Sequence, residues 1–103
     1  FWVLYLNASN KILDQVRISQ GGVTGTVVDY KLIVKRAVER LAQGILLVHN
    51  HPSGNPLPSD ADTLITEKLV RAASLFEITV ADHVIITSGE CYSFRSHGFF
   101  DRL

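Results

Sequence analysis

The stretch GILLVHNHPSG, residues 44–54, carries the strongest structural signal in this sequence. Residues 45–48 form a short apolar run that follows a glycine, as is typical of a central strand covered on both faces. Residues 49–58 contain three prolines and a glycine, which predict a stiff, irregular loop. The pattern therefore predicts a buried strand that ends at a polar loop.

Two helices are expected, one on either side of this stretch in the sequence. Asp29 is the predicted N-cap of a helix over residues 30–43, and Gly44 is the residue at which this helix should stop. A second helix is predicted to begin at Ser59 and to run to about residue 76. Apolar residues recur with helical spacing in both segments and should form the buried faces. They are Ile33, Val34, Ala37, Val38 and Leu41 in the first helix, and Leu64, Ile65, Leu69, Ala72, Ala73 and Phe76 in the second.

The other apolar segments are predicted to be strands. Before the helices they cover residues 2–6 and 12–18, on either side of a turn at 7–10, and residues 24–28, which follow the break at Gly21-Gly22. After the second helix they cover residues 78–80, 84–87 and 91–94. Because strands and helices interleave, the sequence predicts an α/β sandwich around a mixed sheet.

Length and charge limit the class of protein. The sequence has 103 residues, enough for one compact domain, and it starts at Phe1 rather than Met, as expected of a piece of a longer chain. Ten basic and ten acidic residues give a net charge of zero. A domain that binds DNA mainly by neutralising phosphates is usually basic, so composition argues against that role without excluding a local patch.

Cysteine content and hydropathy add further limits. Cys91 is the only cysteine, so no intrachain disulfide and no cysteine-only zinc site can form. We expect it to be a packed or half-buried thiol, in a chain compatible with a reducing cytoplasm. The apolar residues 1–6 are too few to span a membrane, so a soluble domain without a membrane partner is expected.

The residues that could perform chemistry gather around the polar loop. His49 and His51 are separated by one residue at a strand end, so their side chains should project to the same side. Asp62 falls in the first turn of the next helix, and the stiff loop could fold it back toward the pair. Two imidazoles and one carboxylate suit a catalytic zinc ion, because three protein ligands leave one tetrahedral position for water.

Each of these pieces also has an ordinary structural interpretation. A histidine pair after a strand is more often a surface or core feature than a metal site. Ser59 followed by Asp62 is also a common capping arrangement, with a serine N-cap and an acidic residue at the third helical position. The capping and metal interpretations are compatible, because a cap that fixes the helix start also helps to place Asp62.

The spacing of these residues resembles a known motif. His49-x-His51-Pro52, followed by Ser59-x-x-Asp62, is similar to the motif of the JAMM (MPN+) metallopeptidases. The fuller string of residues 49–54, with Pro58-Ser59 and the later Asp82-His83-Val84-Ile85, resembles the RadC branch of that superfamily. The likeness extends over nearly the whole chain.

The resemblance implies a JAMM or cytidine-deaminase-like three-layer sandwich, with a mixed sheet flanked by helices. It implies that His49, His51 and Asp62 bind Zn²⁺ and that Ser59 is catalytic, helping to stabilise an oxyanion. It also implies hydrolysis of peptide or isopeptide bonds, and therefore a peptide or protein substrate. RadC relatives carry a DNA-repair label, which the motif itself does not explain.

One expected residue is missing. JAMM enzymes use a glutamate at the start of the first strand as general base, whereas the strand here begins at Phe1 without one. Either this glutamate lies just upstream in a longer chain, or the protein is a pseudoenzyme. His83 is predicted to be a strand histidine with a hydrogen-bond partner, with a supporting role near the metal as the alternative. His97 is assigned no role.

Four functions fit parts of this sequence. The first is a zinc-dependent amide hydrolase, and the second is a DNA-repair module that binds nucleic acid or protein without hydrolysis. The second rests only on Lys31, Lys35, Arg36 and Arg40, which also fit the solvated face of a helix. An inactive scaffold is disfavoured by the intact ligand set, and a zinc deaminase by the absence of a Cys-x-x-Cys pair.

Overall fold

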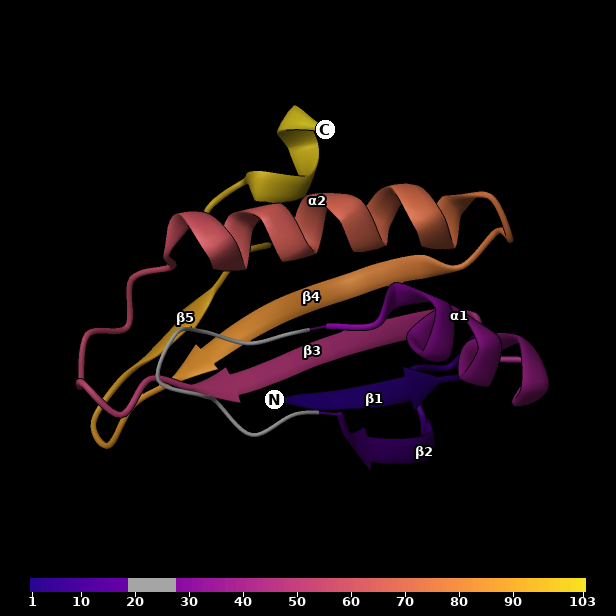
Figure 1. Cartoon of the computed structure of the whole chain (residues 1–103), viewed down its shortest axis with the longest axis horizontal. Coiled ribbons are helices and arrows are strands. Elements are labelled where there is room, and N and C mark those ends of the chain that lie inside the picture. Colours follow the sequence, from indigo (N-terminus) through magenta and orange to yellow (C-terminus); the bar gives the residue numbers. More distant parts are fainter. Residues whose placement is uncertain (19–27) are drawn as a thin grey trace.

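A computed structural model of the chain describes residues 1–18 and 28–103 (Figure 1). The strand predicted at residues 24–28 falls almost wholly outside these residues. The elements of the described part, in chain order, are β1 (Trp2–Leu6), β2 (Ile12–Arg17), α1 (Tyr30–Glu39), β3 (Gly44–Asn50), α2 (Asp60–Ser74), β4 (Thr79–Ile86), β5 (Cys91–Ser93) and a short 3₁₀ helix (Phe99–Arg102).

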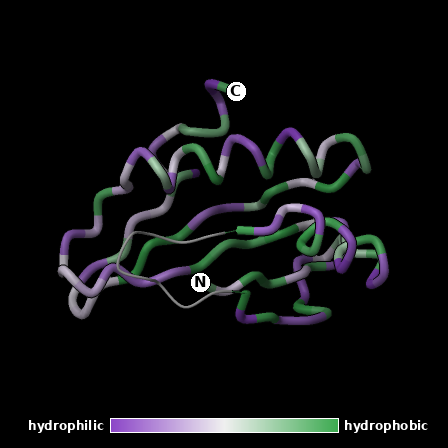
Figure 2. Tube along the Cα trace, viewed as in Figure 1, coloured by the Kyte–Doolittle hydropathy of each residue, from purple (hydrophilic) through white to green (hydrophobic). Residues whose placement is uncertain are grey.

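The five strands form one mixed sheet in the order β2-β1-β3-β4-β5. β3 and β4 are parallel, with α2 as the crossover between them, and the other pairs are antiparallel. β3 is the middle strand, and hydrophobic residues occupy most of β1 and β3 (Figure 2). The predicted α/β fold with a mixed sheet and a buried central strand is therefore confirmed.

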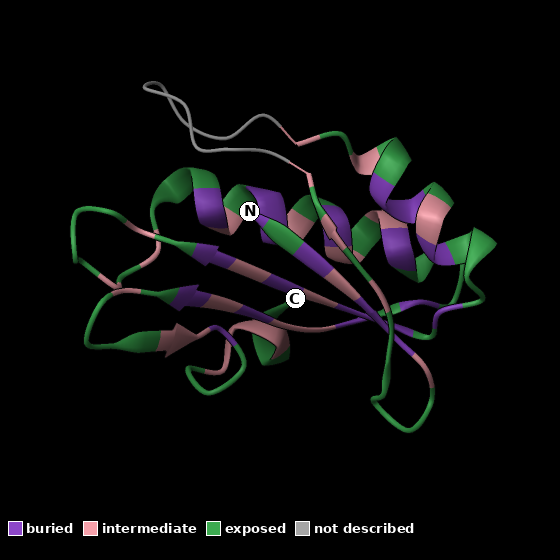
Figure 3. Cartoon of the chain, turned by 90° about the horizontal axis from the view of Figure 1, so that it is seen from below, coloured by how far each residue is buried: buried purple, intermediate pink, exposed green. Residues whose placement is uncertain are grey.

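Both helices pack on the same face of the sheet (Figure 3). The core between them and the sheet combines residues of β1, α1, β3, α2 and β4. It includes Val3, Tyr5, Ile33, Ala37, Ile45, Leu47, Leu69, Ala73 and Val80. In the helices, Ile33, Val34, Ala37, Ile65, Leu69 and Ala73 are buried as predicted, whereas Val38, Leu41, Leu64 and Phe76 are exposed. The helical spacing correctly identified the buried face of each helix, but it predicted a wider buried face than the structure has.

The opposite face of the sheet carries no helix among the described residues. Alternation along the paired strands directs six apolar side chains to this face, and Trp2 and Ile86 are 41% and 43% exposed there. The six are Trp2, Leu4, Leu46, Val48, Val84 and Ile86. Helices on both faces of the sheet, as in a three-layer sandwich, are therefore not seen in the described part of the chain.

Both helices end on a non-glycine residue in the left-handed conformation. Leu41 has φ 51°, and its N–H bonds the carbonyl of Val38 while the next N–H, of Ala42, bonds the carbonyl of Ala37. Glu77, with φ 59°, closes α2 with the same pair of backbone bonds. This Schellman arrangement stops α1 at Glu39. The prediction of a helix to residue 43 with Gly44 as its stop was wrong, because Gly44 already belongs to β3.

β4 is one continuous strand rather than the two predicted at residues 78–80 and 84–87. Its register with β3 shifts by one residue, because Ile45 pairs with Val80 but Leu46 pairs with Asp82. Ala81 is therefore an extra residue in β4, as in a β-bulge. The bulge interrupts the alternation of apolar and polar residues, which explains why the sequence suggested two short strands.

The edges of the sheet are more exposed than predicted. β2 was expected to be half-buried, but Ile12 and Leu13 are 57% and 43% exposed on this edge strand. Cys91, at the start of the other edge strand, is exposed, so the expectation of a packed or half-buried thiol was wrong. None of the helices in the described part is long and apolar enough to cross a membrane.

Candidate metal centre

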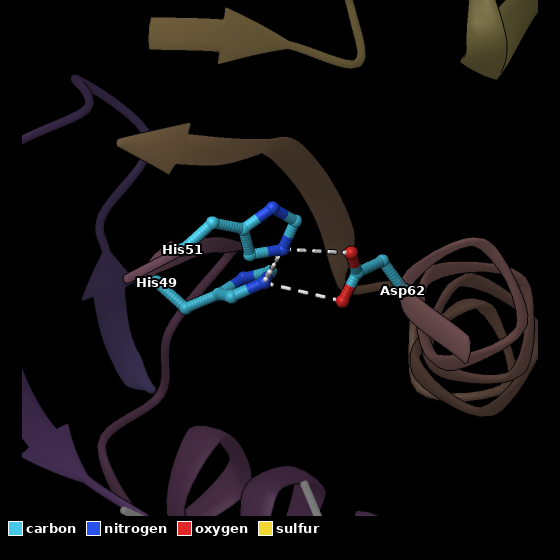
Figure 4. A group of neighbouring side chains, drawn as sticks. All are labelled: His49, His51 and Asp62. Carbon is cyan, nitrogen blue, oxygen red and sulfur yellow. Dashed lines mark hydrogen bonds and ion pairs between the residues drawn. The ribbon is translucent and has the colours of Figure 1, made fainter. Parts of the chain in front are cut away.

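Two histidines leave the carboxyl end of the central strand on the same side. His49 is the sixth residue of β3 and is buried, whereas His51 follows the strand directly and is half-buried. Their Nε2 atoms are 3.0 Å apart, as the alternation of side chains predicted (Figure 4). The two ring nitrogens therefore face one point in space.

Asp62 reaches the same point from the first turn of α2. Its Oδ1 lies 3.1 Å from Nε2 of His49, and its Oδ2 lies 3.0 Å from Nε2 of His51 (Figure 4). Ligand atoms of a tetrahedral zinc ion, bound at about 2.0–2.2 Å, lie roughly 3.3 Å from one another. The three side chains thus already have nearly the separation that one metal ion requires.

A capping box sets the position of Asp62. Ser59 is the N-cap of α2: its Oγ accepts the N–H of Asp62 at 3.1 Å, and its own N–H donates to Oδ2 of Asp62 at 2.8 Å. The capping interpretation of the sequence is therefore confirmed, and it is compatible with a metal-binding role for Asp62. The same bonds fix the start of the helix and the position of the Asp62 carboxylate.

The surroundings of Asp62 keep it ionised. Burial alone would raise the pKa of its carboxyl, but the polar contacts with His49 and with Ser59 outweigh burial and hold that pKa well below its usual range. The first turn of a helix also favours a negative charge at this position. The site therefore presents a carboxylate, not a neutral acid, to a cation.

The hydrogen bond of Nδ1 of His51 determines which ring nitrogen is free to bind a metal ion. Nδ1 lies 2.9 Å from the backbone carbonyl oxygen of Asn55, which can only accept, so Nδ1 carries a hydrogen. In the neutral ring, Nε2 then has a lone pair that faces the Asp62 carboxylate. A lone pair that faces a carboxylate oxygen is favourable only with a cation between the two atoms. Two histidines and one aspartate are a ligand set that zinc accepts. The residues present therefore fit a metal ion.

A third histidine lies behind the pair. Nε2 of His83, in β4, is 2.9 Å from Nδ1 of His49, and its Nδ1 is 2.6 Å from Oγ1 of Thr66 in α2. Its ring is fully buried, stacks on Phe94 with centroids 4.5 Å apart, and lies edge-on to Phe1. Burial, with the nearby His49 second, lowers the pKa of His83 to about 3. The prediction of a strand histidine with a hydrogen-bond partner is confirmed.

Thr66 and Phe1 are the residues of this region that the sequence did not indicate. Thr66 sits four residues after Asp62, the helical spacing for one face, but a threonine in a helix carries no chemical signal of its own. The ring of Phe1 stacks on that of His49, with centroids 5.2 Å apart. The N-terminal end of β1 therefore lies beside the metal centre.

The remaining acidic residues do not join the cluster. Among the described residues, the group of side chains that could hold a metal ion consists of His49, His51 and Asp62. Glu39 ends α1, Glu77 follows α2, and Glu90 lies between β4 and β5, as the sequence indicated. The described residues thus provide three side chains that could hold a metal ion, but no glutamate in the position of a general base.

Comparison with known proteins gives a consistent result. A family model described as a RadC-like JAB domain matches residues 1–99. A UPF0758 protein of Flavobacterium johnsoniae is 46% identical over 100 residues, which are 97% of this chain and 44% of that protein. The UPF0758 protein YfjY of Escherichia coli is 42% identical over 98 residues, which are 95% of this chain and 61% of that protein. The chain spans about half the length of these relatives.

Proposed function

Because the chain belongs to the RadC-like JAB domain family, we propose that it is a zinc-dependent hydrolase of peptide or isopeptide bonds. The observation that carries the proposal is the convergence of His49, His51 and Asp62, whose donor atoms lie within 4.8 Å of one another. Three ligands suit a catalytic ion better than a structural one, which usually has four protein ligands.

The chain's own residues would divide the work as follows. A zinc ion held by the three ligands would lower the pKa of a bound water to roughly 7 and polarise a substrate carbonyl. Ser59 Oγ already accepts the N–H of Asp62, so its hydroxyl hydrogen remains to be donated to a developing oxyanion. The start of α2 adds a positive dipole at the same place. Ser59 is in this proposal a catalytic residue as well as a cap.

A proton carrier is the part that the described residues do not supply. Since the ring of Phe1 stacks on His49, a residue that precedes Phe1 in a longer chain would lie next to the metal centre. We propose that a glutamate in that place acts as the general base. Positioned general acid–base groups contribute about 10²–10⁴-fold to the rate, so the 103-residue chain alone should bind zinc and cleave amides poorly.

The test is a comparison of two versions of the protein on one amide substrate and one isopeptide substrate, each loaded with zinc. One version is the 103-residue chain, and the other is extended at its N-terminus by its native residues. Faster cleavage by the extended version, abolished by His49→Ala, supports the proposal. Equal cleavage by both versions places the base within residues 1–103. Zinc binding without cleavage by either version contradicts hydrolysis of amides.

A DNA-repair module that binds nucleic acid or protein remains the alternative proposal. For either function we propose a cytoplasmic location. Its sequence support was a basic cluster on α1, but two of these four side chains have an acidic partner. Arg36 and Arg40 both bind Oδ2 of Asp14, at 2.7 and 3.0 Å. The charge available for phosphates is therefore smaller than the sequence suggests. A DNA affinity of the chain that falls steeply with salt would favour this alternative.

A further inference from the structure

Four residues of the site form a closed ring of polar contacts. His49 Nδ1 lies 2.9 Å from His83 Nε2, and His83 Nδ1 lies 2.6 Å from Thr66 Oγ1. Thr66 Oγ1 lies 2.8 Å from the backbone oxygen of Asp62, whose carboxylate returns to His49 Nε2 at 3.1 Å. The ring thus connects the strand that carries one ligand, the helix that carries another, and β4, which carries neither.

The direction of these bonds follows from counting hydrogens. The backbone oxygen of Asp62 can only accept, so the one hydroxyl hydrogen of Thr66 points to it. Thr66 Oγ1 must then accept from Nδ1–H of His83. A neutral His83 has a lone pair on Nε2, which accepts Nδ1–H of His49. His49 is left with its lone pair on Nε2, the nitrogen that faces Asp62 and His51.

The surroundings of His83 favour its neutral form. The ring is completely buried between α2 and the sheet, packed flat against Phe94 and edge-on against Phe1. A charged imidazole in such a place would lose its hydration without regaining it from aromatic neighbours. The neutral ring satisfies both of its nitrogens with the two partners that the structure provides.

We propose that His83 and Thr66 are positioning residues that hold His49 in its Nδ1–H tautomer, with Nε2 presented to the metal ion. This inference rests on the proposed metal centre and extends it. A histidine ligand normally needs a partner for its other nitrogen, and loss of such a partner costs about 10–100-fold in metal affinity. Here the partner is a second histidine, itself oriented by a threonine one helical turn after Asp62.

The experiment uses Thr66→Val, which removes the hydroxyl and preserves the shape of the side chain. Thr66→Ser restores the hydroxyl, and Thr63→Val is the matched control. Thr63 donates to the carbonyl of Ser59, four residues earlier, as Thr66 does to Asp62, but Thr63 is not a member of the ring. His83→Phe keeps the stacking on Phe94 and leaves Nδ1 of His49 without its acceptor, so it serves if Thr66→Val does not fold.

Two measurements are made on each folded protein. The first is the zinc dissociation constant by competition with a chelator. We expect it to rise roughly 10–100-fold in Thr66→Val and His83→Phe, and to change little in Thr66→Ser and Thr63→Val. The second is the tautomer of His49 in the zinc-free protein, from ring nitrogen NMR spectra. We expect Nδ1–H in wild type, and a mixture or the other tautomer in Thr66→Val.

The inference is overturned if Thr66→Val binds zinc as tightly as wild type, or if zinc-free wild type has His49 in the Nε2–H form. The NMR measurement needs neither bound zinc nor turnover. A failure of the proposed hydrolase activity would therefore leave this result unchanged, and the two proposals can fail separately.

Discussion

Oδ2 of Asp62 accepts the backbone N–H of Ser59 at 2.8 Å, and the same oxygen faces Nε2 of His51 at 3.0 Å. One carboxylate oxygen thus serves both the helix cap and the ligand set. Changes at Asp62 will combine a loss of helix stability with a loss of metal binding. Ser59 allows a cleaner separation of the two effects. Its bond to Oδ2 of Asp62 comes from its backbone N–H, which Ser59→Ala keeps, while the side-chain hydroxyl is lost.

Ser59→Ala should lower turnover more than it lowers zinc affinity. Loss of an oxyanion donor costs on the order of 10²–10³ in rate, while loss of the N-cap side chain costs about 1 kcal/mol in the free energy of unfolding. Turnover of the N-terminally extended protein, zinc content and thermal stability should be measured on the same samples. Unchanged turnover with reduced stability would mean that Ser59 is a cap alone.

Zinc should stabilise the folded chain, with one ion bound per molecule. At a free concentration of one hundred times the dissociation constant, binding adds about 2.7 kcal/mol to the free energy of unfolding. His51→Ala should remove most of this gain, and His97→Ala should keep it because His97 stacks on Tyr92, outside the ligand set. Equal zinc content in wild type and His51→Ala would contradict the ligand assignment. Acid should release the metal, because protonated imidazoles cannot bind it.

Leu41→Gly and Glu77→Gly should each stabilise the fold by about 1 kcal/mol, because both residues are held at positive φ. Leu75→Gly is a matched control for Leu41→Gly. Both leucines are 83% exposed, but Leu75 has φ −63°, so glycine there should destabilise. Denaturant midpoints of the three variants test the prediction. A loss of stability in Leu41→Gly would show that its side chain contributes more than its backbone conformation costs.

Tyr5 should make the fold sensitive to alkali. Its hydroxyl is buried and donates to the carbonyl of Ile33 at 3.0 Å, and burial raises its pKa to about 12. An unfolded tyrosine ionises near pH 10. The stability linked to Tyr5 is therefore fully present below about pH 10 and is lost as the pH rises toward 12.

The measurement for Tyr5 is the denaturant midpoint at about pH 9 and pH 11. Wild type should lose more stability over this interval than Tyr5→Phe, with Tyr92→Phe as the control for loss of a half-buried tyrosine. Tyr5→Phe itself should cost roughly 1 kcal/mol at neutral pH, the usual net value of one hydrogen bond. Parallel pH profiles for wild type and Tyr5→Phe would exclude Tyr5 as the cause.

The central strand and the convergence of the two histidine side chains could be predicted because each has a local signal. The run at residues 45–48 and the alternation of His49 with His51 depend only on neighbours in sequence. The helix end at Leu41 could not be predicted, since a leucine at positive φ is uncommon and its backbone bonds are visible only in the fold. The same holds for Thr66, whose role depends on a histidine seventeen residues away.

The β-bulge at Ala81 determines whether Asp82 or His83 faces the metal centre. Beyond Ala81, Asp82 pairs with Leu46 and His83 pairs with Leu47, so His83 turns inward and Asp82 turns to the open face. Because side-chain direction has a period of two, a strand without the bulge, in which Ala81 paired with Leu46, would carry the opposite phase from that point on. Asp82 would then face the core, and His83 would face solvent. The bulge at Ala81 thus decides whether a carboxylate or an imidazole lies behind His49.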